Sequence, residues 1–311
     1  MNNLNLQTNY LDIQHFFNLK LTNNKPDIFI NKSLYKYLLV IQEQIQQYSN
    51  WNKMKPYIHV HELLYNDNQT YRFYIYIELF NQYKLKNISY TLHISNNTLE
   101  SLNALLMFEN NPINIHDITN MNEIMNPKPI THKYNLICCD IINDENELSY
   151  SKFMLIQILY ALTVQNKKGT FILKIYDIFY SSTIDMIYLL SCCYENITVY
   201  KPSIVDVISS EKYIICEKFK YDDFDNKIYE GCCSSIDNDM YIERIFTFDI
   251  GYYFIDRLIE INSILGQSQI ESIKNIIHLL LSENICKLES IKLYNVKKCK
   301  EWCEKHNIIT S

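Results

Sequence analysis

Hydrophobic and polar positions divide the middle of the chain into segments with two different periods. Short apolar runs at 134–141, 169–178 and 211–219 are typical of strands buried on both faces. Between them, 150–167 and 183–194 carry apolar residues at helical spacing and predict helices. Strands that alternate with helices of this length predict an α/β fold with a mostly parallel, doubly wound sheet. Helices would cover both faces of that sheet through right-handed crossovers.

Further segments extend this predicted sheet on its N-terminal side and beyond the second helix. The segments expected to be strands are 57–64, 88–95, 113–118 and 196–201. Residues 97–108 show the pattern of a helix, whereas 70–83 (TYRFYIYIELFNQY) fits a helix and a strand equally well. We take 57–64 as the first strand of the sheet and 88–95 as the second.

The two ends of the chain have a different character from this block. Residues 30–48 predict a helix, residues 221–239 are polar and turn-rich, and 242–306 shows helical periodicity without strands. The polar stretch indicates a boundary or an exposed loop. We therefore divide the chain into three parts: a helical N-terminal extension at 1–55, an α/β core at 56–220 and a helical C-terminal extension at 221–311.

Composition narrows the class of protein. The chain has 311 residues, of which 48% are hydrophobic, so it can bury a sizeable core. A net charge of -6 argues against binding of nucleic acid by a uniformly basic surface, and we predict no DNA partner. A local basic groove for RNA is compatible with this charge. No apolar run reaches the ~18 residues that span a bilayer, and the first residues do not resemble a signal peptide.

The ten cysteines occur mostly as adjacent pairs within apolar runs. Neighbouring residues on a strand point to opposite faces of the sheet, so such pairs make poor disulfide partners. A free cysteine in an apolar run behaves as a small hydrophobic residue. We therefore expect reduced cysteines and a cytoplasmic location.

Lys174 lies in the middle of the apolar strand FILKIYD, where an ammonium group needs an explanation. Asp140 ends the strand YNLICCD, and Glu211 opens SSEKYIIC. Because ligands of wound sheets bind beyond the ends of neighbouring strands, we expect the three side chains to converge. A lysine between two carboxylates either stays charged or has a lowered pKa and acts as a general base. The alternatives are an edge lysine that extends its ammonium to water and a structural ion pair.

These elements, in this order, resemble the FtsJ/RrmJ-like family of RNA ribose 2'-O-methyltransferases. The resemblance covers 134–219 and rests on YNLICCD, the helix with Gln157, KKGTFILKIYD, NITVYKP and SSEKYIICEKF. It implies a Rossmann-like methyltransferase fold, S-adenosyl-L-methionine as the cofactor, and RNA, above all capped mRNA, as the partner. The family's scheme passes a methyl group to a ribose hydroxyl and requires no metal.

The same resemblance implies a catalytic Lys-Asp-Lys-Glu tetrad. Three of its members map onto Asp140, Lys174 and Glu211. In the family the first lysine lies on an N-terminal helix in the context Ser-Arg-x-x-[Phe/Tyr]-Lys-Leu. The stretch NKSLYKYLLVIQE resembles that context and makes Lys36 the candidate, with an exposed helix lysine as the alternative.

Two stretches depart from the family pattern. Members carry a glycine-rich turn after the first strand, because only glycine lets the backbone approach the cofactor closely. We place the corresponding segment at 59–73, where Glu62 is the acidic candidate for cofactor binding and Leu63, Leu64 and Tyr65 replace Pro-Gly-Gly. The expected cofactor loop is therefore missing.

The second departure lies between the Lys-Pro and Ser-x-Glu motifs, where the family often has Ser-Arg. Here Val205 and Asp206 occupy those places and reverse a charge in the expected RNA groove. The stretch INIHDIT supplies Asp117 as a candidate near the adenine of the cofactor, with a polar strand end as the alternative. Asp140 is also a candidate for cofactor binding.

The C-terminal stretch VKKCKEWCEKHNI resembles the tail of FtsJ-like proteins from large cytoplasmic DNA viruses. Its residues Cys299, Cys303 and His306 supply three metal donors, but a structural zinc site normally has four, so we predict no metal site. Trp302 is expected to anchor this helix to the core. The viral resemblance places the protein in the host cytoplasm or the virion.

Three functions stay open at this stage. The first is an active viral enzyme that methylates the ribose of mRNA caps or of another RNA. The second is a catalytically inactive methyltransferase-fold subunit that stabilises or stimulates a viral mRNA-capping enzyme, an interpretation favoured by the missing glycines. The third, a plain interaction module, explains none of the three strand-end charges.

Overall fold

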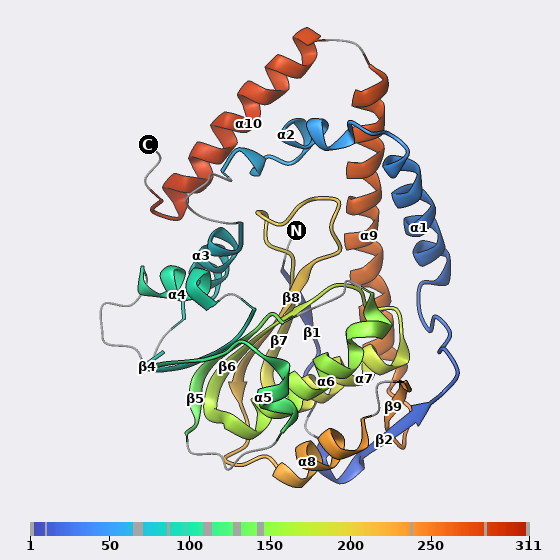
Figure 1. The fold of residues 1–311 in the computed structure, drawn as a ribbon, viewed down its shortest axis with the longest axis vertical. Helices are drawn as coiled ribbons and strands as arrows, with labels where there is room; N and C mark the ends of the chain where they lie inside the picture. The colour runs from blue at the N-terminus through green and yellow to red at the C-terminus, as the bar shows by residue number, and fades with distance from the viewer. Residues whose placement is uncertain are drawn as a thin grey trace.

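The fold was analysed in a computed structural model of the chain. It describes residues 3–9, 11–64, 71–85, 88–96, 98–107, 114–126, 132–141, 146–236, 239–282 and 285–308. The described residues form one large sheet of order β1-β7-β8-β6-β5-β3-β4 and a small sheet that pairs β2 with β9 (Figure 1). The strands are β1 (Asn3–Leu6), β2 (Phe17–Thr22), β3 (Tyr90–Ile94), β4 (Asn114–Ile118), β5 (Tyr134–Cys139), β6 (Gln165–Ile175), β7 (Tyr194–Tyr200), β8 (Lys212–Phe219) and β9 (Tyr241–Phe246).

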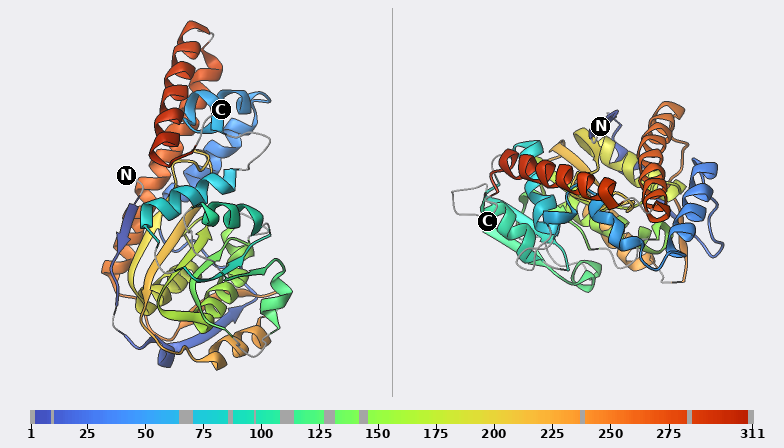
Figure 2. Two further views of the ribbon diagram at one scale, coloured as in Figure 1. Left: turned by 90° about the vertical axis from the view of Figure 1, so that its left-hand side faces the viewer. Right: turned by 90° about the horizontal axis from the view of Figure 1, so that it is seen from above.

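Helices cover both faces of the large sheet and extend beyond one of its ends (Figures 1 and 2). The α-helices are α1 (Lys32–Gln46), α2 (Lys55–Ile58), α3 (Tyr71–Tyr83), α4 (Thr98–Leu106), α5 (Met121–Met125), α6 (Glu147–Val164), α7 (Ser181–Cys193), α8 (Asn226–Ser235), α9 (Tyr252–Leu281) and α10 (Ile285–Lys305). Short 3-10 turns are η1 (Ile13–Phe16), η2 (Trp51–Met54) and η3 (Glu62–Leu64). Helices α3 and α4 pack on one face, α6 and α7 on the other, and α10 with the far half of α9 stands above the rim (Figure 2).

The direction of the strands creates a switch point in the sheet. Parallel pairing joins β4 to β3, β3 to β5 and β5 to β6, whereas β8 runs antiparallel to both β6 and β7, and β1 runs antiparallel to β7. The chain leaves β3 through α4 toward β4 on one side, and leaves β5 through α6 toward β6 on the other. In wound sheets the ligand crevice lies at such a reversal, here beyond the ends of β3 and β5. The predicted fold class, a doubly wound α/β sheet with helices on both faces, is confirmed, and the sheet is mixed because its parallel pairings are joined by the antiparallel pairings of β8 and β1.

Side chains alternate between two cores along each central strand. Cys138 and Ile172 belong to the core under α3, whereas the adjacent Cys139 belongs to the core under α6. The adjacent pair on β5 therefore points to opposite faces, as the sequence predicts. Asp140 and Lys174 lie two residues beyond Cys138 and Ile172, so the same period directs both side chains toward α3.

The predicted strand at 57–64 is wrong, because the structure forms α2 and η3 there. Pro56 occupies the first turn of α2, a position that suits proline and disfavours a central strand. Residues 71–83 of the ambiguous segment form helix α3, in which every residue from Phe73 to Phe80 is buried. Burial on all sides removes the one-sided apolar pattern by which a helix is recognised.

The predictions for the polar stretch and for a strand-free C-terminal part are also wrong. Within 221–239 the chain forms α8, whose N-terminus is capped by Asp225 accepting a hydrogen bond from the backbone N–H of Lys227. Strand β9 begins the C-terminal part and pairs with β2, more than two hundred residues earlier. The N-terminal part likewise contributes β1 to the large sheet. The division at residues 55 and 220 stays a prediction.

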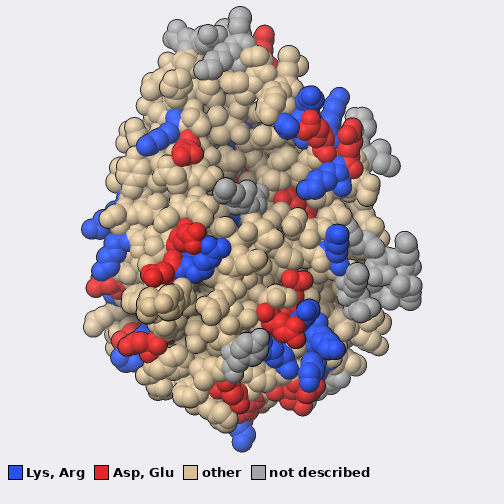
Figure 3. All heavy atoms as spheres, turned by 180° about the vertical axis from the view of Figure 1, so that it is seen from behind, with Lys and Arg blue, Asp and Glu red and all other residues tan. Residues whose placement is uncertain are grey.

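Charges on the rear surface are mixed rather than gathered by sign, as Figure 3 shows for that face. Within the described ranges, no helix combines the length and the apolar character needed to cross a membrane. The described cysteines are free thiols, nearly all of them buried.

Candidate active site

A buried ion pair lies where β6 ends and β8 begins. Because β8 is antiparallel to β6, its first residues meet the last residues of β6, and Lys174 is in register with Tyr213. Lys174 Nζ lies 3.2 Å from Glu211 Oε2, and the two side chains are 3% and 4% exposed. The lysine that looked misplaced in an apolar strand is thus neutralised by an acid on the neighbouring strand.

Asp140 follows β5 at the same rim and is also buried, with 2% exposure. Its Oδ2 atom accepts a hydrogen bond of 3.1 Å from the Tyr76 hydroxyl, whereas Oδ1 is buried and has no hydrogen-bond partner among the described residues. Burial raises the pKa of Asp140, and the charge of Arg72, a hydrogen bond with Ser95 and the charge of Lys174 each oppose that rise. The three strand-end residues predicted from the sequence therefore lie in one electrostatic cluster.

Helix α3 contributes side chains to this cluster that sequence reasoning missed. The Tyr71 hydroxyl donates to Glu211 Oε2 at 3.2 Å, and Tyr76 reaches Asp140. From β8, the Tyr213 hydroxyl donates to Glu211 Oε1 at 2.8 Å. Burial is the largest cause that raises the pKa of all three tyrosines, so each is a neutral hydrogen-bond donor at pH 7.

The sequence carried one matching residue as a signal for this helix, Arg72. The family context Ser-Arg-x-x-[Phe/Tyr]-Lys-Leu can be laid on the stretch 71–77, where Arg72 stands at the arginine, Tyr76 at the lysine and Ile77 at the leucine. The ambiguity of 70–83 between helix and strand hid this alignment. The helix that faces the cluster is α3, and it carries a tyrosine where the resemblance expects a lysine.

Lys36 lies away from this network on α1. Its side chain is exposed, and it takes part in no hydrogen bond or ion pair within the described part of the chain. The buried residues of α1 pack with α9 and with Phe179, not with the strand-end cluster. Its assignment as the first tetrad lysine stays a prediction that no contact in the structure supports.

The candidates for cofactor binding are scattered. Glu62 is half-buried on η3, where burial raises its pKa and Lys55 and Asp206 are its charged neighbours. Asp117 is exposed on the outer strand β4, one residue before its end, in register with His93. Of the proposed loop, Tyr65 and the side chain of Leu63 lie outside the described residues.

The position of the cofactor turn differs from the prediction. Since 57–64 is helical and β3 is the strand beside β5, the turn at the switch point is the one between β3 and α4. It begins with Ser95, whose backbone N–H donates to the carbonyl of Ile118, and Asn96. The sequence has no glycine in this turn either.

The replacement of Ser-Arg by Val205 and Asp206 has a structural explanation. Val205 is buried in the core under α3, and Asp206 Oδ2 lies 2.6 Å from Lys55 Nζ. The unexpected negative charge is therefore neutralised by an ion pair with the residue that opens α2.

A second buried polar network lies next to the cluster and holds the loops at the rim. Lys212 Nζ donates to the carbonyl of Tyr176, and Lys201 Nζ donates to the carbonyl of Ser209. Burial lowers the pKa of Lys201 to about 8. Burial raises the pKa of Asp177, which the charge of Lys212 opposes. These bonds connect the segment after β6 to the segment that leads into Glu211.

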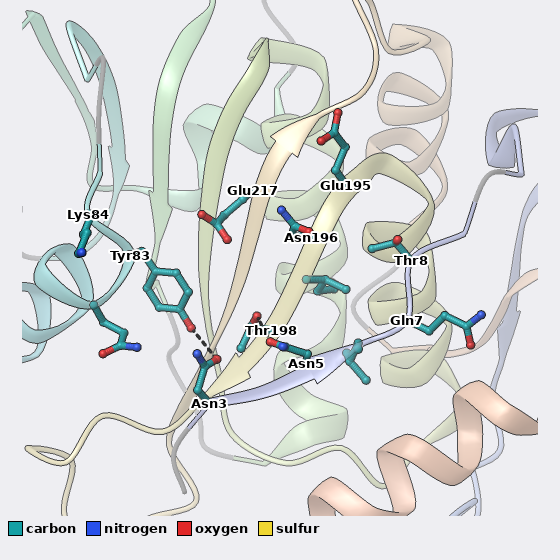
Figure 4. A pocket seen from close by; sticks show the side chains of 13 residues that line it. Asn3, Asn5, Gln7, Thr8, Tyr83, Lys84, Glu195, Asn196, Thr198 and Glu217 are labelled. Atoms are coloured by element: carbon teal, nitrogen blue, oxygen red, sulfur yellow. Dashed lines mark hydrogen bonds between the residues drawn. The ribbon is translucent and has the colours of Figure 1, made fainter.

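Two other features lie apart from the cluster. An open pocket of about 680 Å³ borders β1, β7 and β8, and Figure 4 shows mostly polar side chains around it. Near α10, His306 Nδ1 lies 2.9 Å from Asn81 Nδ2, and Cys299 Sγ contacts the carbonyl of Val60. No group of three or more histidine, cysteine or acidic side chains in the described ranges is arranged to hold a metal ion.

Comparisons with known proteins point to one family for the region around the cluster. Residues 86–219, from just before β3 to the end of β8, match the sequence model described as FtsJ-like methyltransferase. A stretch of 74 residues is 36% identical to cap-specific mRNA (nucleoside-2'-O-)-methyltransferase 1 of Bos taurus, covering 24% of this chain and 9% of that protein. A stretch of 156 residues is 28% identical to cap-specific mRNA (nucleoside-2'-O-)-methyltransferase 2 of Pongo abelii, covering 50% of this chain and 20% of that protein. The matches thus span a small part of these relatives.

Proposed function

We propose that this chain is an RNA ribose 2'-O-methyltransferase that acts on capped mRNA and takes its methyl group from S-adenosyl-L-methionine. The observation that carries the proposal is the buried pair of Lys174 with Glu211, 3.2 Å apart, in one cluster with Asp140 at the switch point of the sheet. The family match to 86–219 and the names of the similar proteins support the same reaction.

The cluster has the chemistry that this reaction needs. A ribose hydroxyl is a weak nucleophile, so a positioned group must accept its proton or stabilise the developing alkoxide. Lys174 is the only one of the strand-end residues that offers an amine for that task. Glu211 holds it in place and is itself held by Tyr71 and Tyr213. A preorganised amine in a dry site has little reorganisation to undergo during the reaction.

The edge of the sheet at which β3 and β5 end has one feature that suits the cofactor. Asp140 Oδ1 is a buried acceptor at the switch point that no described residue bonds, which suits a ligand that brings a hydrogen-bond donor or a positive charge. Asp140 and the turn that begins at Ser95 are the groups that would hold S-adenosyl-L-methionine. When bound, that cofactor supplies an electrophilic methyl group, and the chain orients the hydroxyl and receives its proton.

A catalytically inactive subunit of a viral capping enzyme is the second candidate, and specific observations favour it. The turn after β3 has no glycine, and Asp140, Lys174 and Glu211 are all buried. Apolar side chains on α1 and α10 are exposed and available to a partner: Tyr37, Leu39, Val40, Leu293 and Tyr294.

Methyl transfer from radiolabelled S-adenosyl-L-methionine to capped RNA separates the two candidates. We expect Lys174→Met to lower the rate by about a hundredfold or more, because removal of a proton acceptor has effects of that size. Lys167→Met is the matched control, since Lys167 lies on the same strand, is half exposed and pairs with Asp222. It should leave the rate unchanged.

Equal rates for wild type and Lys174→Met would contradict the enzyme. So would a wild-type chain that neither binds the cofactor in calorimetry nor methylates RNA. If that chain instead raised the activity of an added capping enzyme, the subunit would be favoured.

A further inference from the structure

The charges of the strand-end cluster do not balance within the three predicted residues. Asp140 and Glu211 are two buried carboxylates, and Lys174 supplies one positive charge. A second buried acid without a cation would be costly, so a further positive group is expected close to Asp140. Lys36 is exposed on α1 and is not bonded to the cluster.

Helix α3 brings a cation to the required place. Arg72 and Tyr76 are four residues apart and therefore share one face of the helix. Tyr76 bonds to Asp140, while Tyr71, next to Arg72, bonds to Glu211. The helix is thus fastened to both acids, and Arg72 lies between the two attachment points.

The electrostatic neighbours of Arg72 agree with this placement. Asp140 is the charged group that acts on it most strongly, ahead of Tyr71, Tyr76 and Tyr213. Burial and the charge of Glu211 raise the pKa of the Tyr71 hydroxyl, and the charge of Arg72 and a hydrogen bond with it oppose that rise. Arg72 is half-buried, so its attraction to Asp140 is only partly screened by water.

We propose that Arg72 is the second cation of this site, a positioning residue that keeps Asp140 ionised and links it through Tyr71 to the Lys174–Glu211 pair. Tyr76 then takes the place at which the resemblance expects a lysine, as a neutral donor to Asp140. The catalytic consequence rests on the proposed function, whereas the charge relation between Arg72 and Asp140 does not.

The presence of Arg72 and Tyr76 in place of the expected lysine changes the chemistry of the site. A lysine ammonium can lose its proton, but a guanidinium does not do so in proteins. Arg72 and Tyr76 therefore hold Asp140 without adding a second amine, and Lys174 is left as the amine among these cluster residues.

The first test follows the ionisation of Asp140 itself. The carboxyl carbon of Asp140 is followed by ¹³C NMR against pH in protein labelled at aspartate, with Asp140→Asn to assign the signal. Groups that face this carboxyl from each packed element are Arg72 and Tyr76 on α3, Ser95 after β3, Cys138 and Cys139 on β5, Lys174 on β6 and Tyr213 on β8. We expect Arg72→Gln to raise the midpoint by about one pH unit or more, the effect of losing an adjacent opposite charge.

Two further variants distinguish the effect of the Arg72 charge from the effect of the shape of its side chain. Arg72→Lys keeps a positive charge and should keep the midpoint close to that of wild type. In the double variant Arg72→Gln with Tyr76→Lys, the charge moves by one helical turn and should return the midpoint toward the wild-type value. In methyl-transfer assays the same order is expected, with a loss of about tenfold or more for Arg72→Gln and partial recovery in the double variant.

An Asp140 midpoint that Arg72→Gln leaves unchanged would overturn the proposal, and so would a double variant that titrates like Arg72→Gln alone. If Arg72→Gln does not fold, Arg72→Met, which removes the charge and keeps much of the side chain's length, is compared with Arg72→Lys. Equal Asp140 midpoints in these two variants would overturn the proposal, and a higher midpoint in Arg72→Met would support it. A chain without methyltransferase activity would refute the proposed function, while the NMR midpoints would still test Arg72.

Discussion

At the scale of single residues, burial governs the behaviour of the ionisable groups. Lys174 is tolerated in a strand because its ammonium pairs with Glu211, which in turn accepts hydrogen bonds from Tyr71 and Tyr213. Glu147, the first residue of α6, shows the same principle with backbone donors. Its carboxylate accepts hydrogen bonds of 2.8 to 2.9 Å from the N–H groups of Phe179 and Tyr180, which fastens α6 to the segment before α7.

Glu147→Gln should change how stability depends on pH. Burial raises the pKa of Glu147 to about 7 from its usual 4.5, so the folded state binds more protons than the unfolded state between these values. Its contribution to the free energy of unfolding is fully present below pH 4.5 and is lost as pH rises to 7. Because glutamine does not ionise, the difference between wild type and variant should change by roughly 3 kcal/mol across this window.

Urea unfolding at several pH values measures that difference. Glu289→Gln, an exposed position on α10, is the control and should follow wild type throughout. A difference between wild type and Glu147→Gln that stays constant from pH 4.5 to 7 would show that burial does not govern this carboxyl.

At the scale of elements, the first residues of β6 show how the strand that carries Lys174 is held in place. Gly169 is buried where the pairing of β5 with β6 shifts register. The preceding Lys168 has a positive φ of 63°, and the chain bends there before it runs straight to Lys174. Backbone atoms of the neighbouring strand approach Gly169 so closely that no side chain fits.

Gly169→Ala should therefore destabilise the protein. An added Cβ would lie 2.8 Å from the carbonyl oxygen of Asn166 and 2.9 Å from that of Asn135, and backbone oxygens cannot turn away as a side chain can. We expect a loss of about 1–3 kcal/mol in the free energy of unfolding, as for other overpacked sites. Gly231→Ala is the matched control, since nothing lies within 4 Å of an added Cβ there.

Gly231 lies inside α8, where alanine is favoured over glycine by about 1 kcal/mol, so the control should be neutral or stabilised. Urea unfolding of the two variants gives the comparison. If both glycines tolerate alanine equally, close packing at the entrance to β6 is not what holds that strand.

At the scale of the whole molecule, the C-terminal helix is tied to the helix that faces the site. Glu78 on α3 is buried and accepts hydrogen bonds from the Tyr200 hydroxyl, from the backbone and side chain of Ser203, and from Trp302 Nε1 at 3.2 Å. The expectation that Trp302 anchors the C-terminal helix agrees with its burial in the core under α3. The chain end and the strand-end cluster therefore share one helix as their support.

Trp302→Ala should detach α10 without unfolding the sheet. The variant removes a large buried ring and one of the donors to Glu78, which should lower the free energy of unfolding by about 3 kcal/mol or more. Hydrogen exchange of the amides of α10 should quicken, with a smaller effect at β5 and β6. Tyr294→Ala, at an exposed aromatic of the same helix, is the control and should leave exchange unchanged. Protection of α10 that persists in Trp302→Ala would show that other contacts hold this helix.

What the sequence by itself determined is the part that local pattern records. The apolar runs at 134–141 and 169–178 identified the central strands and their two buried faces. The places where those strands end identified Asp140 and Lys174, and Glu211 followed from the start of the next strand. Both features can be read from the local sequence. The two-residue period of a strand sets the face of the sheet to which a side chain points, and the end of the strand places its last residues at the edge where ligands of wound sheets bind.

Only the tertiary structure decided which elements meet. Segments far apart in sequence are joined by the antiparallel course of β8, the pairing of β2 with β9 and the addition of β1. Apolar periodicity records that a face is buried, but not which element buries it. The sequence selected Lys36 because the stretch around it resembles the family's lysine context, and it overlooked Arg72 and Tyr76 because their segment fitted a helix and a strand equally well. Helix α3 is buried on all sides, so its pattern carried no direction, and its contacts with Asp140 became visible only once the chain was folded.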